Sequence, residues 1–351
     1  MAERRAHRVS DIVTQSGLSR ATVDRVLHGR AGVRPSTVAQ VQRAIEELDR
    51  QRDQVHLSAR PLILDLVMQA PQRFSAASRQ ALEDELQALR PAVVRVRSHL
   101  DERSDPTAAA RLVDGLAARG CDGLVLKAPD HPAVREAVDR LARAGVPTVT
   151  FVTDVTGCAR AAYVGVDNRA AGATAAYLVH HWTGSTGDVL VTESSAAFHG
   201  EEERIAGFAE TLADLSPGRA VRTVTGTDGL DLTMHDAVAA VLAERPGLDA
   251  VYSVGGGNRA TLAAFAAAGR RPAAFVAHDL DRDNRGLLRR HELTAVLHHD
   301  LRADMRRAVR MLLQARGILP GRPVTLPSQV QVVTPFNEPS GLASDDAPPG
   351  R

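Results

Sequence analysis

The stretch RVSDIVTQSGLSRATVDRVLHGRAGVRPSTVAQVQRAIEEL, residues 8–48, predicts three short helices and no strand. Apolar residues recur at helical spacing in each third of it. The first helix is expected to end at Ser16-Gly17, because glycine permits the positive φ of a tight turn. Ser19 is suited to cap the second helix, and Pro35 to begin the third. A unit of this size is too small to be very stable alone.

The chain after this stretch has a different pattern. Residues 49–60 are polar and lack a clear apolar face, which indicates a linker, and from Pro61 short apolar runs alternate with amphipathic helices. Runs buried on both faces, each followed by a helix, predict parallel sheets in a doubly wound α/β architecture. Ten strands are more than a single sheet usually contains, so we expect two lobes. The predicted strands are residues 62–68, 93–98, 121–127, 146–152, 161–166, 187–193, 219–225, 248–254, 273–279 and 293–299.

Composition agrees with a chain of several domains. The chain has 351 residues, 44% of them hydrophobic, which is more than one core usually holds. Its 43 Lys and Arg residues nearly cancel 42 Asp and Glu residues, which excludes a uniformly basic coat for nucleic acid. The local exception is residues 1–60, with 11 Arg against 7 acidic residues. Lys127 is the only lysine, which we attribute to the codon usage of a GC-rich genome.

Several classes of protein are not indicated. Cys121 and Cys158, the only cysteines, have no metal-type spacing, and a disulfide scaffold is not expected. The sequence has neither an apolar leader nor a membrane-length apolar run, so we expect a cytoplasmic protein without a membrane partner. Adjacent histidines at 180–181 and 298–299 could suggest a metal site, but neighbouring side chains on a helix point in different directions. The sequence has no Ser/His/Asp set, P-loop or HExxH motif that would indicate an enzyme. We therefore expect no metal, no cofactor and no enzyme.

Residues 8–48 resemble, without gaps, the DNA-binding head of the LacI family of transcription regulators. That head carries a V-A-x-x-A-G-V-S-x-x-T-V-S-R-V-L-N-G run. The resemblance implies a helix-turn-helix domain over residues 1–49, whose second helix enters the major groove of operator DNA. The side chains expected to face bases are Arg20, Ala21 and Arg25, because Arg can bind guanine bidentately and Ala can touch a thymine methyl. A three-helix protein-binding module is the alternative.

The same resemblance implies phosphate contacts and a hinge. The expected phosphate contacts are Ser10, Ser19, Thr22 and His28. Asp24 stands where the family usually has Ser, and would repel phosphate unless it pairs with Arg25 or accepts from a cytosine amine. Residues 50–60 occupy the place of the hinge but lack the family's Y-x-P-N run, and Leu57 is the only candidate for a minor-groove wedge.

Residues 61–338 resemble the type I periplasmic-binding-protein core, through CDGLVLKAPD, AYVGVDNRAAG, EEERIAGFAETL, VYSVGGGN and VLHHDL. The resemblance implies a core over 61–339 with one lobe at about 61–165 and 296–325, the other at about 166–295 and 326–339, and a disordered tail at 340–351. Two such lobes close on a ligand at their strand ends. The effector contacts that it implies are Phe74, Asp154, Arg204, Asn258, Asp279 and His299.

One motif favours a different class. Residues 255–260, GGGNRA, fit the dinucleotide fingerprint G-x-G-x-x-A, and Asp279 follows about 20 residues later. A nucleotide-dependent oxidoreductase or sugar-modifying enzyme with a fused head is therefore the alternative function. We favour the binding-protein interpretation of this glycine run, because the motif comes after six strands and no catalytic Tyr-x-x-x-Lys pattern accompanies it. The sequence predicts a homodimeric LacI-type regulator, a repressor, controlled by a small polar effector such as a sugar.

Overall fold

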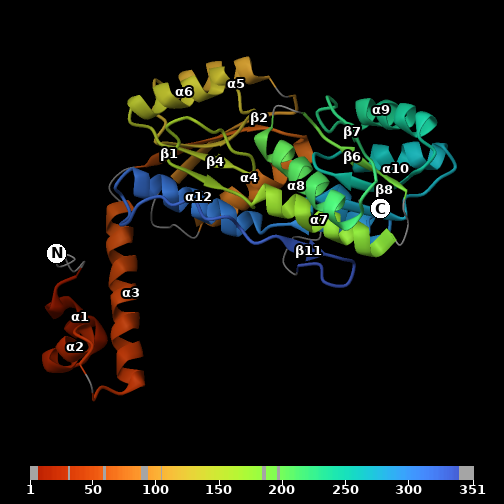
Figure 1. Cartoon of the computed structure of the whole chain (residues 1–351). Helices are drawn as coiled ribbons and strands as arrows, with labels where there is room; N and C mark the ends of the chain where they lie inside the picture. The colour runs from red at the N-terminus through yellow and green to blue at the C-terminus, as the bar shows by residue number, and fades with distance from the viewer. Residues whose placement is uncertain are drawn as a thin grey trace, which may run out of the picture.

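The computed structural model describes residues 7–30, 32–57, 61–87, 94–103, 105–183, 187–195 and 198–339. Over these ranges a three-helix unit precedes two α/β lobes (Figure 1). The elements are α1 Val9–Ser16, α2 Arg20–Leu27, α3 Pro35–Leu57, β1 Leu62–Gln69, α4 Gln72–Gln87, β2 Val94–Asp101, α5 Pro106–Asp114, β3 Gly123–Lys127, α6 Pro132–Arg143, β4 Thr148–Phe151, β5 Ala162–Val164, α7 Asn168–Thr183, β6 Asp188–Thr192, α8 His199–Leu215, β7 Val221–Val224, α9 Asp231–Glu244, β8 Leu248–Ser253, α10 Asn258–Ala267, β9 Ala274–His278, α11 Arg282–Arg289, β10 Ala295–His298, α12 Leu301–Ala315 and β11 Gln331–Val333.

The N-terminal unit packs α1, α2 and α3 around the buried side chains of Ile12, Val23 and Val41. Gly17 ends α1 in the left-handed conformation, as its sequence predicts. The third helix is longer than expected: α3 continues to Leu57, so residues 50–57 are helical rather than a linker. Residues 36–57 contain no glycine or proline and are rich in Glu, Gln, Arg and Leu, which favour a continuous helix.

The first lobe is a parallel five-stranded sheet with strand order β2-β1-β3-β4-β5. One face is covered by α4 and α12, which bury Leu82, Met305 and Leu312 against it. The other face is covered by α5 and α6 through Val113, Val138 and other apolar side chains. The last covering helix, α12, follows the parallel strands of the second lobe in the sequence, so the first lobe is built from two separate segments of the chain.

The second lobe is a six-stranded sheet with strand order β11-β10-β9-β8-β6-β7, parallel except for β11. All ten expected strands are present, and the short antiparallel edge strand β11 was not predicted. Strand β10, Ala295–His298, pairs with β9 in this sheet, so the chain returns to the first lobe after residue 298 and not at 296. Helices α9, α10 and α11 cover one face and α7 and α8 the other.

The carboxyl ends of both sheets point toward the junction of the lobes (Figure 1). Lys127 ends β3, His278 ends β9, and Gln69 ends β1, so polar residues collect at that edge. This is the edge at which open parallel sheets bind ligands. In the described ranges, no helix is both long enough and apolar enough to cross a bilayer.

Candidate functional site

A cleft lies between the lobes, at the carboxyl ends of their strands, with about 730 Å³ of empty space counted out to its open mouth. The residues that line it come from both lobes and include Gln69, Arg73, Phe74, Glu102, Lys127, Val152, Thr153, Ser194, Phe198, Glu201, Arg204, Asp228, His278, Asp279, Asp281 and Asn284. Three of the six expected effector residues, Phe74, Arg204 and Asp279, are among them.

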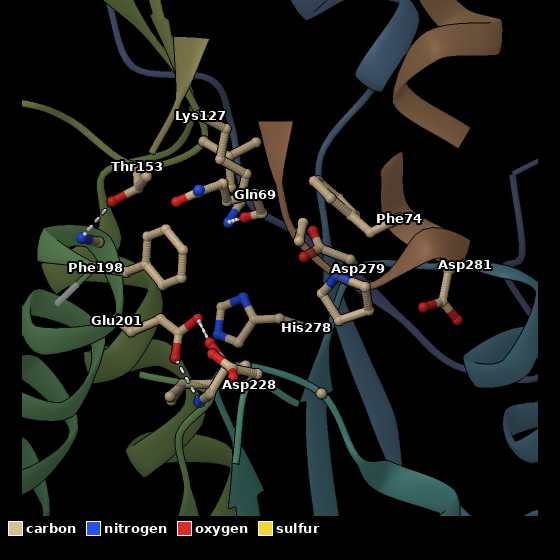
Figure 2. A pocket seen from close by; sticks show the side chains of 18 of the residues that line it. Gln69, Phe74, Lys127, Thr153, Phe198, Glu201, Asp228, His278, Asp279 and Asp281 are labelled. Carbon is tan, nitrogen blue, oxygen red and sulfur yellow. Dashed lines mark hydrogen bonds between the residues drawn. The ribbon is translucent and has the colours of Figure 1, made fainter. Parts of the chain in front are cut away.

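Two aromatic rings face the cleft from opposite lobes. Phe74 comes from α4, and Phe198 caps the start of α8 (Figure 2). Both side chains are buried. Aromatic faces in a cleft rich in hydrogen-bonding groups suit a ligand that is apolar on one face and polar at its edge.

Arg204 is held by two hydrogen bonds inside the second lobe. Its Nε donates to Asn168 Oδ1 at 2.8 Å and its guanidinium donates to the Val254 carbonyl at 3.0 Å. Asn168 in turn donates to Tyr163 Oη at 3.1 Å, which connects this arginine to the first lobe where the chain crosses between them. Arg204 is only 3% exposed, so its charge reaches the cleft from a fixed position.

Asp279 is supported from behind by a charged histidine. His299 Nδ1 bonds Asp304 at 2.5 Å, and its Nε2 lies 3.5 Å from Asp279 Oδ1, an ion pair slightly longer than a hydrogen bond. Burial opposes the charge of His299, but the two carboxylates raise its pKa to about 9. Burial likewise opposes ionisation of Asp279, but His299 and Arg204 hold the pKa of its carboxyl well below the usual range. Asp279 is therefore an ionised acceptor in the cleft.

Backbone strain is concentrated at this cleft. Four non-glycine residues in the described part of the chain have positive φ, and three of them line the cleft: Val152 at 66°, Asp228 at 51° and Asp279 at 64°. Such conformations cost on the order of 1–3 kcal/mol each and cluster at functional sites. The Val152 carbonyl accepts from Tyr163 Oη and Asn168 Nδ2, which hold that residue in place.

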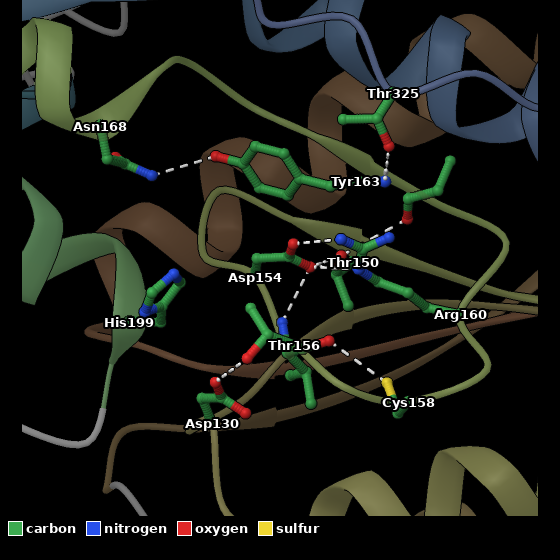
Figure 3. Close-up of polar contacts among 12 residues, drawn as sticks. Asp130, Thr150, Asp154, Thr156, Cys158, Arg160, Tyr163, Asn168, His199 and Thr325 are labelled. Carbon is green, nitrogen blue, oxygen red and sulfur yellow. Dashed lines mark hydrogen bonds and ion pairs between the residues drawn. The ribbon is translucent and has the colours of Figure 1, made fainter.

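Asp154 does not line the cleft, contrary to expectation. It lies beyond the end of β4, where its carboxylate accepts from Thr150, from the backbone of Val155 and twice from Arg160 (Figure 3). These bonds satisfy the carboxylate locally. The chain turns back after Thr153, and the side chain therefore faces its own loop rather than the other lobe.

Asn258 and His299 also lie behind the cleft lining. Asn258 Nδ2 donates to Asn284 Oδ1 at 2.6 Å, and Asn284 donates to the carbonyls of His278 and Asp279. Asn258 thus helps to hold the corner that carries Asp279, and His299 supports the Asp279 carboxylate as described above. Neither side chain lines the cleft itself.

The glycine run before Asn258 is explained by packing. A Cβ at Gly255 would lie 2.4 Å from the Ser194 nitrogen, one at Gly256 would meet the Arg73 guanidinium at 2.4 Å, and one at Gly257 would meet Met234 at 2.6 Å. The space that these glycines leave is filled by the protein. The dinucleotide interpretation needs that space for a pyrophosphate.

Sequence reasoning missed Lys127, Phe198, Glu201 and several further lining residues. Lys127 ends a predicted strand, so the strand-end rule could have found it. Glu201 accepts from the backbone and hydroxyl of Ser194, both at the end of β6. Phe198 lies in an irregular segment after β6, where no periodic pattern predicts which side chain faces the cleft.

The residues expected to bind DNA lie on the first two helices of the N-terminal unit and at the caps of the second, except Leu57. Arg20, Ala21 and Arg25 are exposed on α2, and Ser10 is exposed on α1. Ser19 caps α2 by accepting from the Thr22 backbone at 3.2 Å. Leu57 is the last residue of α3, and its side chain lies outside what the structure describes.

Asp24, the departure from the family pattern, has its partners in the segment that follows its helix. Its carboxylate lies 3.2 Å from His28 Nδ1 and 3.9 Å from Arg30. The Arg30 guanidinium offsets part of the repulsion that this carboxylate would exert on a phosphate. Elsewhere in the described ranges, no group of three or more His, Cys, Asp or Glu side chains is arranged to hold a metal ion.

Comparison with known proteins identifies the core. The family model described as a periplasmic binding protein domain matches residues 66–317. A glucose-galactose binding protein from Geobacillus stearothermophilus is 16% identical with a TM-score of 0.72, over 80% of this chain and 99% of its own. A carbohydrate transporter from Acidothermus cellulolyticus 11B, solved with myo-inositol, is 19% identical with a TM-score of 0.69, over 79% of this chain and 96% of its own.

A regulator has the same fold. A putative LacI transcriptional regulator from Bacteroides fragilis is 11% identical with a TM-score of 0.70, over 79% of this chain and 98% of its own. No curated protein matches the chain in sequence. These likenesses establish the two-lobed fold, which is typical of non-enzymatic binders and regulators, and leave the ligand to be argued from the cleft.

Proposed function

Because the chain belongs to the periplasmic binding protein domain family, we propose that it is a LacI-type transcription regulator, a cytoplasmic repressor, whose core binds a neutral sugar or polyol. The observation that carries the proposal is the fusion of this core to a three-helix unit with Arg20, Ala21 and Arg25 exposed on its second helix. A transport binding protein has no use for such a unit.

The charges of the cleft support a neutral ligand. The buried cations in the cleft and directly behind it are Lys127, Arg204 and the protonated His299, and the buried anions there are Glu201, Asp279 and Asp304. Asp281, also buried in the lining, is paired with Arg73. The two sets cancel, so a charged ligand would leave a buried charge unpaired, which is costly. Hydroxyl groups both donate and accept, and can therefore use cationic donors and carboxylate acceptors together.

A homodimer is part of the proposal. One head offers only a few base contacts, so specificity for an operator requires two heads on half-sites about one helical turn apart. The effector binds one arrangement of the two lobes more tightly than the other. Because the two arrangements differ in their affinity for DNA, effector binding changes DNA binding.

The test combines DNA selection with effector binding. Arg25→Ala should relax base preference in selection from random duplex DNA and cost about 1–3 kcal/mol on a cognate site, because Arg25 is assigned to a base edge. Thr22→Ala, the matched control on the same helix, should weaken binding to all sequences alike because it is assigned to phosphate. Identical site preferences for wild type and Arg25→Ala would refute the assignment.

The effector arm uses calorimetry with D-glucose, D-galactose, D-arabinose, D-allose and myo-inositol, and with NAD as the contrasting ligand. We expect a neutral sugar or polyol to bind and NAD not to bind. Binding of NAD with no member of the panel would instead favour the alternative, a nucleotide-dependent enzyme with a fused head.

A further inference from the structure

Lys127 occupies a position that codon usage does not explain. It is the only lysine in a chain with 43 basic residues, so arginine serves at every other cationic position. Codon usage accounts for the scarcity of lysine but not for the place of the one that remains. That place is the end of β3, where the side chain is 8% exposed and lines the cleft (Figure 2).

The ammonium group of Lys127 has unused donors. Its Nζ donates to the Gln69 carbonyl at 3.0 Å and lies 3.9 Å from the centre of the Phe198 ring. An ammonium has three N–H donors, and we find no second acceptor for it in the described ranges. Beside it, the Gln69 side chain donates to the Asp105 carbonyl, but its Oε1 is buried without a partner among the described residues.

The charged groups around Lys127 come from two elements of the second lobe. Glu201 and Arg204 face it from α8, and Asp279 faces it from the end of β9. Burial and Arg204 lower the pKa of Lys127 to about 8, while the two carboxylates oppose that change. Lys127 is therefore charged at neutral pH, and a buried donor without an acceptor is costly until a ligand oxygen fills its place.

Arginine would not serve here. Its guanidinium is planar and larger, whereas an ammonium is a compact point donor. Nζ already lies against the Phe198 ring, so a larger head group must displace the ring or enter the ligand space. The position of the single lysine fits a requirement for a small cation.

We propose that Lys127 determines the specificity of the cleft: its ammonium donates to one hydroxyl of a neutral polyol lying against Phe198, and Gln69 Oε1 accepts from the adjacent hydroxyl. This inference rests on the proposed function, because it specifies which chemical group of the effector the cleft recognises. The recognised feature is a vicinal pair of hydroxyls. A ligand without the first of them should bind about tenfold to a hundredfold more weakly.

The test is calorimetry with the member of the sugar panel that binds wild type. Lys127→Met, which keeps the length of the side chain but not its charge, should lose about tenfold to a hundredfold in affinity. Lys127→Arg should also bind more weakly despite its charge. Arg111→Met, an exposed change on α5 away from the cleft, is the matched control and should bind like wild type. Thermal melts verify that each variant is folded.

A pH profile separates direct contact from a structural role. If only the ammonium form binds, the affinity of wild type should fall about fourfold between pH 7 and 8.5, and the affinity of Lys127→Arg should stay level. His299 also loses its proton at higher pH, but it is present in both proteins, so its titration does not produce a difference between them.

Isotope-labelled lysine gives a further measurement that needs no variant. Because the chain has one lysine, the labelled protein has a single lysine side-chain NMR signal, which should shift when the sugar binds and show a raised pKa. A bound sugar that leaves this signal unmoved, or that binds Lys127→Met as tightly as wild type, overturns the inference and leaves the proposed function standing. If no member of the panel binds wild type, the proposed effector class fails, and the inference fails with it.

Discussion

Three buried histidines in the core differ in charge because their neighbours differ. His278 and His298 are buried among groups that disfavour a cation, and burial, the largest cause, lowers the pKa of His298 to about 4 and that of His278 well below its usual value. His299 is equally buried, but it lies between Asp279 and Asp304 and its pKa is raised to about 9. Adjacent positions in the sequence thus carry different protonation states at neutral pH.

This difference predicts how stability depends on pH. The pKa of His299 is higher in the folded protein than in the unfolded chain, so its contribution is fully present below about pH 6.5 and is lost as the pH rises through 9. Between pH 6.5 and 8 the contribution of His299 to the free energy of unfolding should fall by about 1.5 kcal/mol. His278, His298 and Lys127, whose folded pKa values are lowered, act in the opposite direction over this range and offset part of the fall.

Urea unfolding at several pH values between 6.5 and 8 measures the effect. His299→Gln cannot titrate, so its unfolding free energy should be lower throughout and should rise rather than fall across this range, because His278, His298 and Lys127 keep their lowered pKa values. His291→Gln, at an exposed position, is the control and should retain the wild-type slope. A wild-type slope in the His299→Gln protein would show that another group is responsible.

At the level of residues, the sequence predicted which edge of the sheets carries the cleft better than it predicted which side chains line that cleft. Phe74, Arg204 and Asp279 lie in the cleft as expected, because strand ends and helix starts of parallel sheets meet there. Asn258 and His299 are one layer behind, and Asp154 faces its own loop. The direction of a side chain after a strand end depends on the turn that follows, which hydrophobic periodicity does not encode.

Helices α7 and α8 are the most closely packed pair among the elements. A Cβ at Gly172 would lie 2.0 Å from the carbonyl oxygen of Arg204, and one at Gly207 would lie 2.1 Å from that of Arg169. The two backbones therefore touch, and the approach brings α8, which carries Glu201 and Arg204, to a fixed position beside the cleft.

Gly172→Ala should therefore destabilise the second lobe. The methyl group cannot fit without separating the helices, and we expect a loss of about 1–3 kcal/mol in the free energy of unfolding even though alanine favours helix. Gly286→Ala on α11 is the matched control, since the nearest atom to its Cβ is the flexible end of Arg290, at 3.2 Å. It should be neutral or slightly stabilising. Denaturant melts that rank the two variants in the reverse order would contradict the packing argument.

At the level of elements, the sequence predicted strands well and ends of helices less well. The ten apolar runs are all strands, and most of them are buried on both faces, which leaves a clear pattern, whereas the edge strands β2 and β7 are only partly buried. Strand β11, only Gln331–Val333, is too short to show alternation. The extension of α3 to Leu57 was missed because a polar helix lacks an apolar stripe, although its residues favour helix.

Among the contacts that join the two lobes, one ion pair lies across the cleft. Arg73, from α4 of the first lobe, pairs with Asp281 at the start of α11 at 2.9 Å and donates to the Gly229 carbonyl at 3.4 Å. Asp281 is 7% exposed, so the pair is shielded from solvent more than a surface ion pair. The contact links the lobes directly, at the mouth of the ligand space.

Arg73→Gln should favour separation of the lobes. Its removal leaves Asp281 without its cation, and we expect a larger radius of gyration by small-angle X-ray scattering and several-fold weaker binding of the effector, since part of the binding energy must then close the cleft. Arg79→Gln, on the same helix and paired at the surface with Glu83, is the control. An unchanged radius of gyration together with unchanged affinity would remove Arg73 from this role.

The strained residues at the cleft have a consequence for the history of such a chain. Val152, Asp228 and Asp279 hold conformations that glycine would adopt without cost, and Asn with less cost than Val. A lineage selected only to stay folded would drift toward glycine or asparagine at these three positions and gain stability. Such substitutions would remove the fixed carboxylate of Asp279 and change the shape of the cleft lining at Val152. The easiest stabilising substitutions at these three positions are therefore the ones that would remove the groups with which the cleft binds its ligand.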